Sequence, residues 1–419
     1  MIYISSSRIY NEEAAINHVN ALAFNRHSSS EGELKCINYI TKELKKDGIN
    51  PIIERFEWAN TLTIVMKLIF ILIFGFIILS QIIMLFPNIT WIIFPLDIIF
   101  IVLILLGAKQ IFDNTRTAYI GRKKKAKNVM MTVQCKDLYP KRPVIIFSAH
   151  HDTASLRLSM TMLKNLYRIA AVSLLTFLIL SLIISILSFL AIFNLIQFDN
   201  SFFFIRNLAL IIGIILLIID AVILGNKKSD KSIGAIDNAS GVAVLIELAK
   251  LLKRNPLNKT DVIFLWCGAE ERGLWGSKQY CNTHFEELLY DYDLDKSYNI
   301  NIDMVGTYIG MIDKHGLFKK KSLNSNLDNI LKASANQQNI KLKNKSVRIG
   351  FGSSDHAVFR AYAKKEEKKG FQVSFLISNK DAKYVHSKND TPEKCSAKNL
   401  NGCIEICYNA IQSLDLRVE

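Results

Sequence analysis

The sequence predicts a three-layer α/β/α sandwich with a mostly parallel central sheet, into which four transmembrane helices are inserted as two hairpins. Three observations support this prediction. Half of the 419 residues are hydrophobic, which is too apolar for an ordinary soluble enzyme of this size. Four apolar segments are long enough to cross a bilayer, and the polar segments between them alternate short strands with helices, as α/β proteins do.

The apolar segments cover residues 62–86, 90–107, 169–196 and 207–224. Each has about 18 residues or more, the usual length of a helical span. A fully buried core helix is the alternative, and four such lengths in one chain argue against it. Turns at 86–90 and 197–207 make two hairpins. We therefore expect five parts: 1–60 (catalytic domain, N-terminal part), 61–108 (first hairpin), 109–165 (catalytic domain, first ligand strand), 166–225 (second hairpin) and 226–419 (catalytic domain, remaining ligands).

Hairpins return the chain to the side that it left, so the three polar parts lie on one side of the membrane. That side holds nearly every lysine and arginine, whereas the two opposite loops hold a single basic residue, Arg206. The positive-inside rule then predicts an integral protein of a prokaryotic plasma membrane with its catalytic domain facing the cytoplasm. Seven cysteines without a CxxC pair agree with a reducing compartment, and no cleavable signal peptide is expected.

The net charge of +15 does not indicate nucleic-acid binding, because lysines beside the apolar segments contribute to it and no basic helix with interleaved aromatics occurs. Within the spans, Asp97 is a functional candidate, since acids inside membranes are costly. The alternative that we favour is that the span begins nearer Pro95 and that Asp97 lies in the membrane interface.

The polar parts contain a capped helix at 28–49 and an amphipathic helix at 237–254 that opens with Asp and Asn. Short apolar runs suited to central strands cover 143–149, 260–269, 298–306 and 371–378. Sheets of this kind place ligands at the carboxyl ends of their strands.

Metal-binding side chains stand at those ends. In chain order they are His150, His151 and Asp152, then Asp237, then Glu270 and Glu271, then Asp303, and finally His386. A Glu-Glu pair is usually solvated, but this one follows a strand too apolar for the surface. Imidazole and carboxylate ligands suit Zn²⁺ or a related metal. Their number exceeds the needs of one tetrahedral ion and suits two metals about 3.5–4 Å apart.

The motifs "SAHHDT", "GAIDNASGVAVLIELA", "CGAEERGLWGSKQY", "NIDMVG", "GSSDHAVF" and "VHSKNDTPEK" resemble, in this order, those of the co-catalytic di-zinc aminopeptidases. That family includes bacterial leucyl aminopeptidases and, more distantly, glutamate carboxypeptidases and glutaminyl cyclases. The resemblance covers nearly all of the polar chain.

The resemblance implies a role for each position. One zinc would be held by His150, Asp237 and Asp303, and the other by Asp237, Glu271 and His386, with Asp237 bridging. Glu270 would be the general base and Asp152 would orient His150. His151 would not be a ligand. Asp355 and His356 would lie beside the substrate, with a structural hydrogen bond as the alternative for His356.

The sequence departs from the family between the first two ligands. The 86 residues from 151 to 236 contain a hairpin where the family has a short loop. We therefore expect a membrane-anchored zinc exopeptidase, an aminopeptidase that hydrolyses N-terminal peptide bonds of peptide substrates. One alternative is a glutaminyl-cyclase-like or other amide-processing enzyme on the same scaffold. The other is a non-catalytic membrane scaffold, which predicts lost ligands. Side-chain preference, native metal and oligomeric state stay open.

Overall fold

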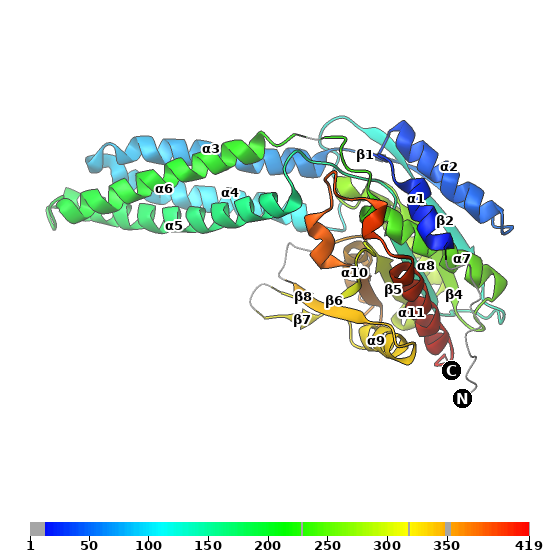
Figure 1. Cartoon of the computed structure of the whole chain (residues 1–419). Helices are drawn as coiled ribbons and strands as arrows, with labels where there is room; N and C mark the ends of the chain where they lie inside the picture. The colour runs from blue at the N-terminus through cyan, green and yellow to red at the C-terminus, as the bar shows by residue number, and fades with distance from the viewer. Residues whose placement is uncertain (1–12, 228, 317–318, 348–352, 419) are drawn as a thin grey trace. The chain divides into compact units, whose positions relative to one another are not determined.

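The computed structural model describes residues 13–227, 229–316, 319–347 and 353–418. The chain divides into two compact units (Figure 1). The first, which we call the sheet unit, comprises residues 1–60, 114–156 and 228–419, and the second, the helical unit, comprises residues 61–113 and 157–227. The division into five parts proposed from the sequence stays a prediction of domain organisation.

The sheet unit is built on one mixed sheet of nine strands. They are β1 (Ile52–Trp58), β2 (Lys124–Val133), β3 (Val144–His150), β4 (Asp261–Cys267), β5 (Tyr298–Ile302), β6 (Ile309–His315), β7 (Lys321–Ser322), β8 (Leu342–Val347) and β9 (Gln372–Leu376). The order is β1-β2-β4-β3-β5-β9-β6-β7, with β8 paired to β6. The predicted α/β class is confirmed, and the parallel pairs are those of the central group β4-β3-β5-β9 and the pair β6–β8. The pairs β1–β2, β2–β4, β6–β9 and β6–β7 are antiparallel.

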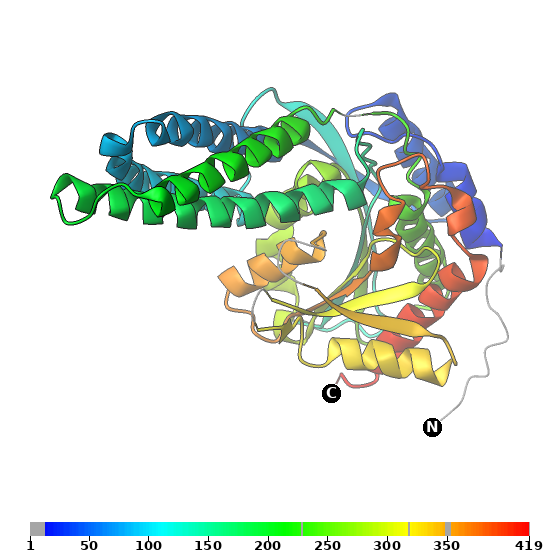
Figure 2. The same ribbon diagram turned by 60° about the vertical axis from the view of Figure 1, so that its left-hand side comes forward.

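Helices cover both faces of this sheet (Figure 2). One layer contains α1 (Ala14–Leu22), α2 (Glu31–Lys45), α7 (Ser240–Arg254), α9 (Leu327–Gln337) and α11 (Ala397–Asp415), and the other contains α8 (Trp275–Asp291) and α10 (His356–Lys365). Because both faces are covered, every residue of β3 and β4 is buried, as is typical of central parallel strands.

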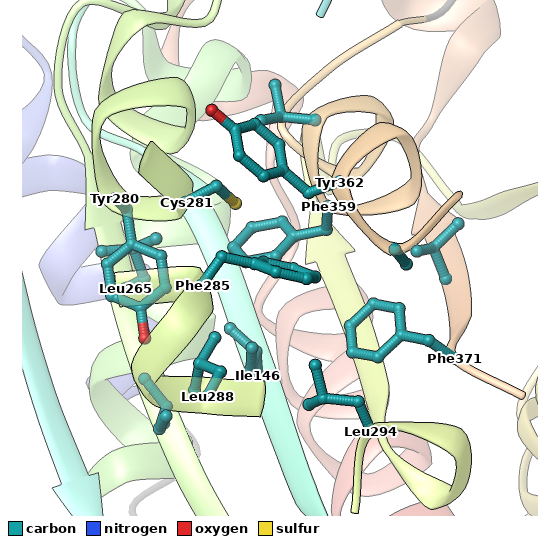
Figure 3. Close-up of a cluster of buried hydrophobic side chains, with 14 of the residues drawn as sticks. Ile146, Leu265, Tyr280, Cys281, Phe285, Leu288, Leu294, Phe359, Tyr362 and Phe371 are labelled. Atoms are coloured by element: carbon teal, nitrogen blue, oxygen red, sulfur yellow. The ribbon is translucent and has the colours of Figure 1, made fainter. Parts of the chain in front are cut away.

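The core between the sheet and the α8–α10 layer is apolar and rich in aromatic rings (Figure 3). Ile146 of β3 and Leu265 of β4 lie against Phe285 of α8 and Phe359 of α10. Burying an aliphatic or aromatic side chain of this size stabilises the fold by about 1.5–3 kcal/mol. This packing fixes β3 and β4, whose carboxyl ends lead into the candidate site.

The helical unit contains α3 (Thr61–Met84), the short helix η1 (Pro87–Ile92), α4 (Ile93–Phe112), α5 (Met160–Ile192) and α6 (Asn200–Leu224). Four stretches are long and apolar enough to cross a membrane: Thr61–Met84, Pro87–Gly107, Met160–Ile192 and Asn200–Leu224. Many of their leucine and isoleucine side chains are exposed. Because soluble monomers rarely expose apolar surface on this scale, the surface suits lipid contact.

A row of serines on α5 makes polar contacts inside the helical unit. Asp97 is only 6% exposed, and one of its oxygens accepts a hydrogen bond of 2.9 Å from Ser181 Oγ. Ser185 and Ser188, on the same side of α5, donate to the main-chain oxygens of Thr90 and Pro87. Asp97 is therefore buried between α4 and α5, and its location in the membrane interface stays a prediction.

Candidate metal centre

Four of the sequence-predicted site residues stand at or just after the end of a strand, or where a short helix begins. His150 is the last residue of β3, and Asp303 follows β5 directly. Glu270 and Glu271 open η3 (Glu270–Arg272), three residues after β4. Two further ligands lie in loop regions: Asp237 in η2 (Ala235–Ala239), before α7, and His386 in the segment after β9 and η5 (Asn379–Lys383).

The structure brings these six residues together in two groups. His150, Glu270 and Asp303 form one group and Asp237, Glu271 and His386 the other, with one donor atom from each residue within 4.8 Å of the others in its group. Both groups combine one imidazole with two carboxylates, the donor set that zinc accepts.

Asp237 joins the two groups. Its Oδ1 lies 3.1 Å from Nε2 of His150, and its Oδ2 lies 3.2 Å from Nε2 of His386. His150 Nε2 also lies 3.3 Å from Asp303, and His386 Nε2 lies 2.7 Å from Glu271. A carboxylate that turns one oxygen toward each group has the geometry of a bridging ligand for two metals.

The electrostatics of the centre favour bound positive charge. Burial would lower the pKa of His150, but Glu270 and Asp303 outweigh burial and raise it well above its ordinary value. The same balance holds for His386, whose pKa the carboxylate of Glu271 raises. Burial would raise the pKa of Asp237, but hydrogen bonds from both imidazoles lower it. Metal ions would take the place of these protons, since ligation requires neutral imidazole and ionised carboxylate.

Glu270 differs from the other carboxylates of the centre. Burial raises its pKa well above the ordinary glutamate value, and the negative charges of Glu271, Asp355 and Asp303 raise it further. A carboxyl group that holds a proton readily is suited to general acid–base work.

Asp152 supports the glutamates more closely than it supports His150. Its carboxylate accepts hydrogen bonds from the main-chain N–H groups of Glu270 at 2.9 Å and Glu271 at 3.3 Å, and from Ser28 Oγ at 2.9 Å. His150 Nδ1 lies 3.1 Å from the main-chain oxygen of Asp152 and 3.7 Å from its carboxylate. The shorter of these two contacts of His150 Nδ1 is with the main-chain oxygen of Asp152, and the orienting role of the Asp152 carboxylate stays a prediction.

Two further polar residues hold the ligand segments and were not singled out from the sequence. Asp390 accepts from the N–H groups of Ile236 and Asp237 at 2.6 and 3.3 Å.

Asn238 accepts a hydrogen bond from the N–H of Met304 and donates one to the main-chain oxygen of Ile302, both at 3.0 Å. It therefore holds the residues on both sides of Asp303. The signal for Asn238 was present, because its Oδ1 also accepts from Gly241 N at 3.0 Å, as the helix-opening Asp-Asn pattern predicts.

The remaining predicted residues lie beside the two groups. His151 is buried with its Nε2 3.0 Å from the main-chain oxygen of Lys127, outside both groups. Asp355 is fully buried, and burial raises its pKa to about 6. His356 stacks on Phe375 with ring centroids 4.2 Å apart, and burial lowers its pKa to about 3. Its buried Nδ1 has no hydrogen-bond partner among the described residues, and both the structural hydrogen bond and the substrate contact of His356 stay predictions.

Comparison with known proteins gives a family match over part of the chain and a shared fold. Residues 219–411 match the model of Peptidase family M28. Aminopeptidase YwaD of Bacillus subtilis (strain 168) is 44% identical over 75 residues, which are 18% of this chain. The match spans only 15% of the length of that relative.

Solved structures share the fold at low sequence identity. The aminopeptidase from Aneurinibacillus sp. strain AM-1 is 16% identical with a TM-score of 0.52, covering 96% of this chain and 94% of that chain. BSAP, a zinc aminopeptidase from Bacillus subtilis, is 13% identical with a TM-score of 0.51 over 96% of this chain and 95% of that chain. A glutaminyl cyclase from an Acidobacteriales bacterium is 14% identical with a TM-score of 0.52, over 100% and 99% of the two chains.

Proposed function

Because residues 219–411 match the model of Peptidase family M28, we propose that the chain is a membrane-anchored zinc aminopeptidase that removes N-terminal residues from peptides. The observation that carries the proposal is the pair of donor groups joined by Asp237, which turns one oxygen toward His150 and the other toward His386. The proposed ligands are those that the sequence predicts: His150, Asp237 and Asp303 for one zinc, and Asp237, Glu271 and His386 for the other.

The chemistry divides between the metals and the chain. Two bound zinc ions would make a bridging water acidic and polarise the scissile carbonyl. Glu270 takes the proton of the attacking water on its carboxylate and donates it to the leaving amine, so that one residue serves first as base and then as acid. Asp152 keeps Glu270 in place through the N–H of that residue. Asp355 is proposed to lie beside the substrate, where its negative charge would favour a free amino group.

Two other functions make different predictions. A glutaminyl-cyclase-like enzyme on this scaffold would need one working zinc, so metal stoichiometry distinguishes it. A non-catalytic scaffold predicts lost ligands, and all six donor residues are present in the sequence.

The membrane part of the proposal rests on the four long apolar stretches of the helical unit. Together with the distribution of lysine and arginine, they support insertion as two hairpins with the sheet unit in the cytoplasm. A reporter fused to the C-terminus that is active only in the cytoplasm tests this topology. A reporter that is silent there, with an exported reporter active at the same position, would overturn it.

The catalytic proposal is tested with purified full-length protein on a panel of aminoacyl-fluorogenic substrates, with and without chelator. Glu270→Gln should lower kcat by about 10²–10⁴-fold, because proton transfer is lost, while zinc stays near about two per chain. N-acetylated substrates serve as the control, since an aminopeptidase requires a free amine. Retained hydrolysis in Glu270→Gln would exclude Glu270 as the general base.

A further inference from the structure

The first two proposed ligands stand at opposite ends of a long insertion. His150 and Asp237 are separated by residues 151–236, which include all of α5 and α6. Within the sheet unit this insertion begins with residues 151–156 and returns with residues 229–236. We call these two segments the base of the insertion. A two-metal site needs its ligands held closely in place, so the two segments must be kept at a fixed position relative to each other.

Arg26 contacts both segments of the base. It is fully buried and lies between α1 and α2 in the sequence. Its Nε donates to the main-chain oxygen of His151 at 2.9 Å. Its two terminal nitrogens donate to the oxygens of Ile233 at 3.1 Å and Gly234 at 2.8 Å. One guanidinium therefore bonds the residue after His150 and the residues three and four positions before Asp237.

The backbone of Arg26 strengthens the same connection. Its N–H donates to Thr153 Oγ1 at 2.9 Å, and its carbonyl accepts from Thr153 N at 3.3 Å. The same terminal nitrogen that contacts Ile233, Nη1, also contacts the main-chain oxygens of Leu22 in α1 and Phe24 in the turn after it.

Serines close the base further along the insertion. The carbonyl of Ser155 accepts from Ser229 N at 3.0 Å, and its hydroxyl lies 2.7 Å from Ser229 Oγ and accepts from Ser232 N at 3.2 Å. The next residue, Leu156, donates its N–H to the carbonyl of His386 at 3.2 Å. The base is thus also bonded to the segment of a third proposed ligand.

We propose that Arg26 is a positioning residue of the two-metal centre. Its hydrogen bonds join the two segments of the base and fix the positions of His150 and Asp237 relative to each other. The inference rests on the proposed function, because it concerns zinc ligation at that centre. It extends the proposal to a residue that touches neither metal nor substrate and acts through the main chain of the ligand segments.

The chemistry of the side chain explains why arginine fits this position. A guanidinium presents five N–H donors in one plane, and here they reach main-chain oxygens of three separate parts of the chain. Lysine has three donors on one nitrogen and cannot span the same set. The positive charge also lies near the carboxylates of Asp152, Asp237 and Asp390 and offsets part of their repulsion.

The test measures zinc affinity of full-length apo-protein in detergent, by competition with a chromogenic chelator and below the melting temperature of each variant. Arg26→Lys and Arg26→Met should bind zinc about 10- to 100-fold more weakly, the usual cost of losing a residue that orients metal ligands. Ser155→Ala should cause a smaller loss in the same direction. At saturating zinc, the Arg26 variants should show a reduced kcat with KM for the peptide little changed.

Arg142→Met is the matched control. Arg142 pairs with the buried Asp261 at 2.7 Å at the amino ends of β3 and β4, far along these strands from the centre. It should lose stability and keep wild-type zinc affinity. Unchanged affinity in Arg26→Lys and Ser155→Ala, or an equal loss in Arg142→Met, would overturn the inference. Failure of the unaltered chain to bind zinc would instead overturn the proposed function, and this inference with it.

Discussion

At the residue scale, the candidate centre is held by buried polar side chains that accept N–H groups of the ligand segments. Asp152 accepts from Glu270 and Glu271, and Asp390 accepts from Asp237. A buried N–H without a partner costs about 1–3 kcal/mol, so these bonds both satisfy the turns and fix their geometry. The ligands owe their positions to main-chain hydrogen bonding as much as to side-chain packing.

His151 provides a residue-scale prediction of pH dependence. Burial lowers its pKa to about 4, so the folded protein holds it neutral where the unfolded chain, with a pKa near about 6.5, takes up a proton. Protonation then favours unfolding. Stability should fall by about 1.4 kcal/mol per pH unit as the pH decreases from about 6.5 toward 4, and be unaffected by this group above about pH 7.

His151→Gln should remove this component, while zinc content stays that of the unaltered protein. Urea unfolding of both apo-proteins at pH 8 and pH 5 measures the difference, and glutamine retains a donor for the oxygen of Lys127. Equal losses of stability in the two proteins between these pH values would show that His151 does not titrate as its burial indicates. A lower zinc content would show that it is a ligand.

The sequence predicts which residues form the centre better than it predicts the hydrogen bonds that hold them. His150, Glu270 and Asp303 can be predicted because central parallel strands bring the residues at their carboxyl ends to one edge of the sheet. The hydrogen bonds of Asp152 cannot be predicted from the sequence, since they depend on a turn in which Ala269 and Leu274 both adopt a left-handed backbone, at φ of 54° and 60°. Neither residue type signals that conformation.

At the element scale, the structure has a longer helix in the second hairpin than the sequence predicts. It also has strands β1 and β2 before and after the first hairpin in the sequence. The apolar segment predicted at 169–196 belongs to a helix that begins at Met160, capped by Ser159 and including Lys164 and Arg168. Charged residues of high helix propensity prolong a helix without lengthening its apolar segment. Strand β2 was not predicted, because three of its first four residues are lysines and mask the buried alternation after them.

The hydrogen bond between Ser181 and Asp97 carries an element-scale prediction. Ser181→Ala should destabilise the helical unit by about 0.6–1.7 kcal/mol, since it removes a buried contact between α5 and α4. Thermal unfolding in detergent, followed by helical circular dichroism, measures the change. Ser201→Ala, at an exposed position of α6, is the control and should leave the transition in place. Equal transitions in all three proteins would show that the contact does not stabilise the unit.

At the scale of the whole molecule, zinc should stabilise one unit and leave the other unchanged. Four carboxylates and two imidazoles converge in the sheet unit, so bound cations relieve repulsion there. At free zinc about 1,000-fold above Kd, each occupied site adds about 4 kcal/mol.

Calorimetry with zinc and with chelator tests this expectation. The transition of the sheet unit should move to higher temperature with zinc, and that of the helical unit should not. Asp237→Ala, which lacks the proposed bridging carboxylate, should show little shift. A metal-independent transition in the unaltered chain would contradict the assignment of a zinc centre.

The placement of the two hairpins within the chain also sets the order in which the sheet and the centre can form during protein synthesis. β1 and β2 pair over seven residues although the first hairpin is synthesised between them, and His150 meets Asp237 only after the second has been made. The sheet and the centre therefore close late, after both hairpins have left the ribosome. A nascent chain stalled before Asp237 holds only His150 of the proposed ligands, so metal capture would report that translation has passed both hairpins.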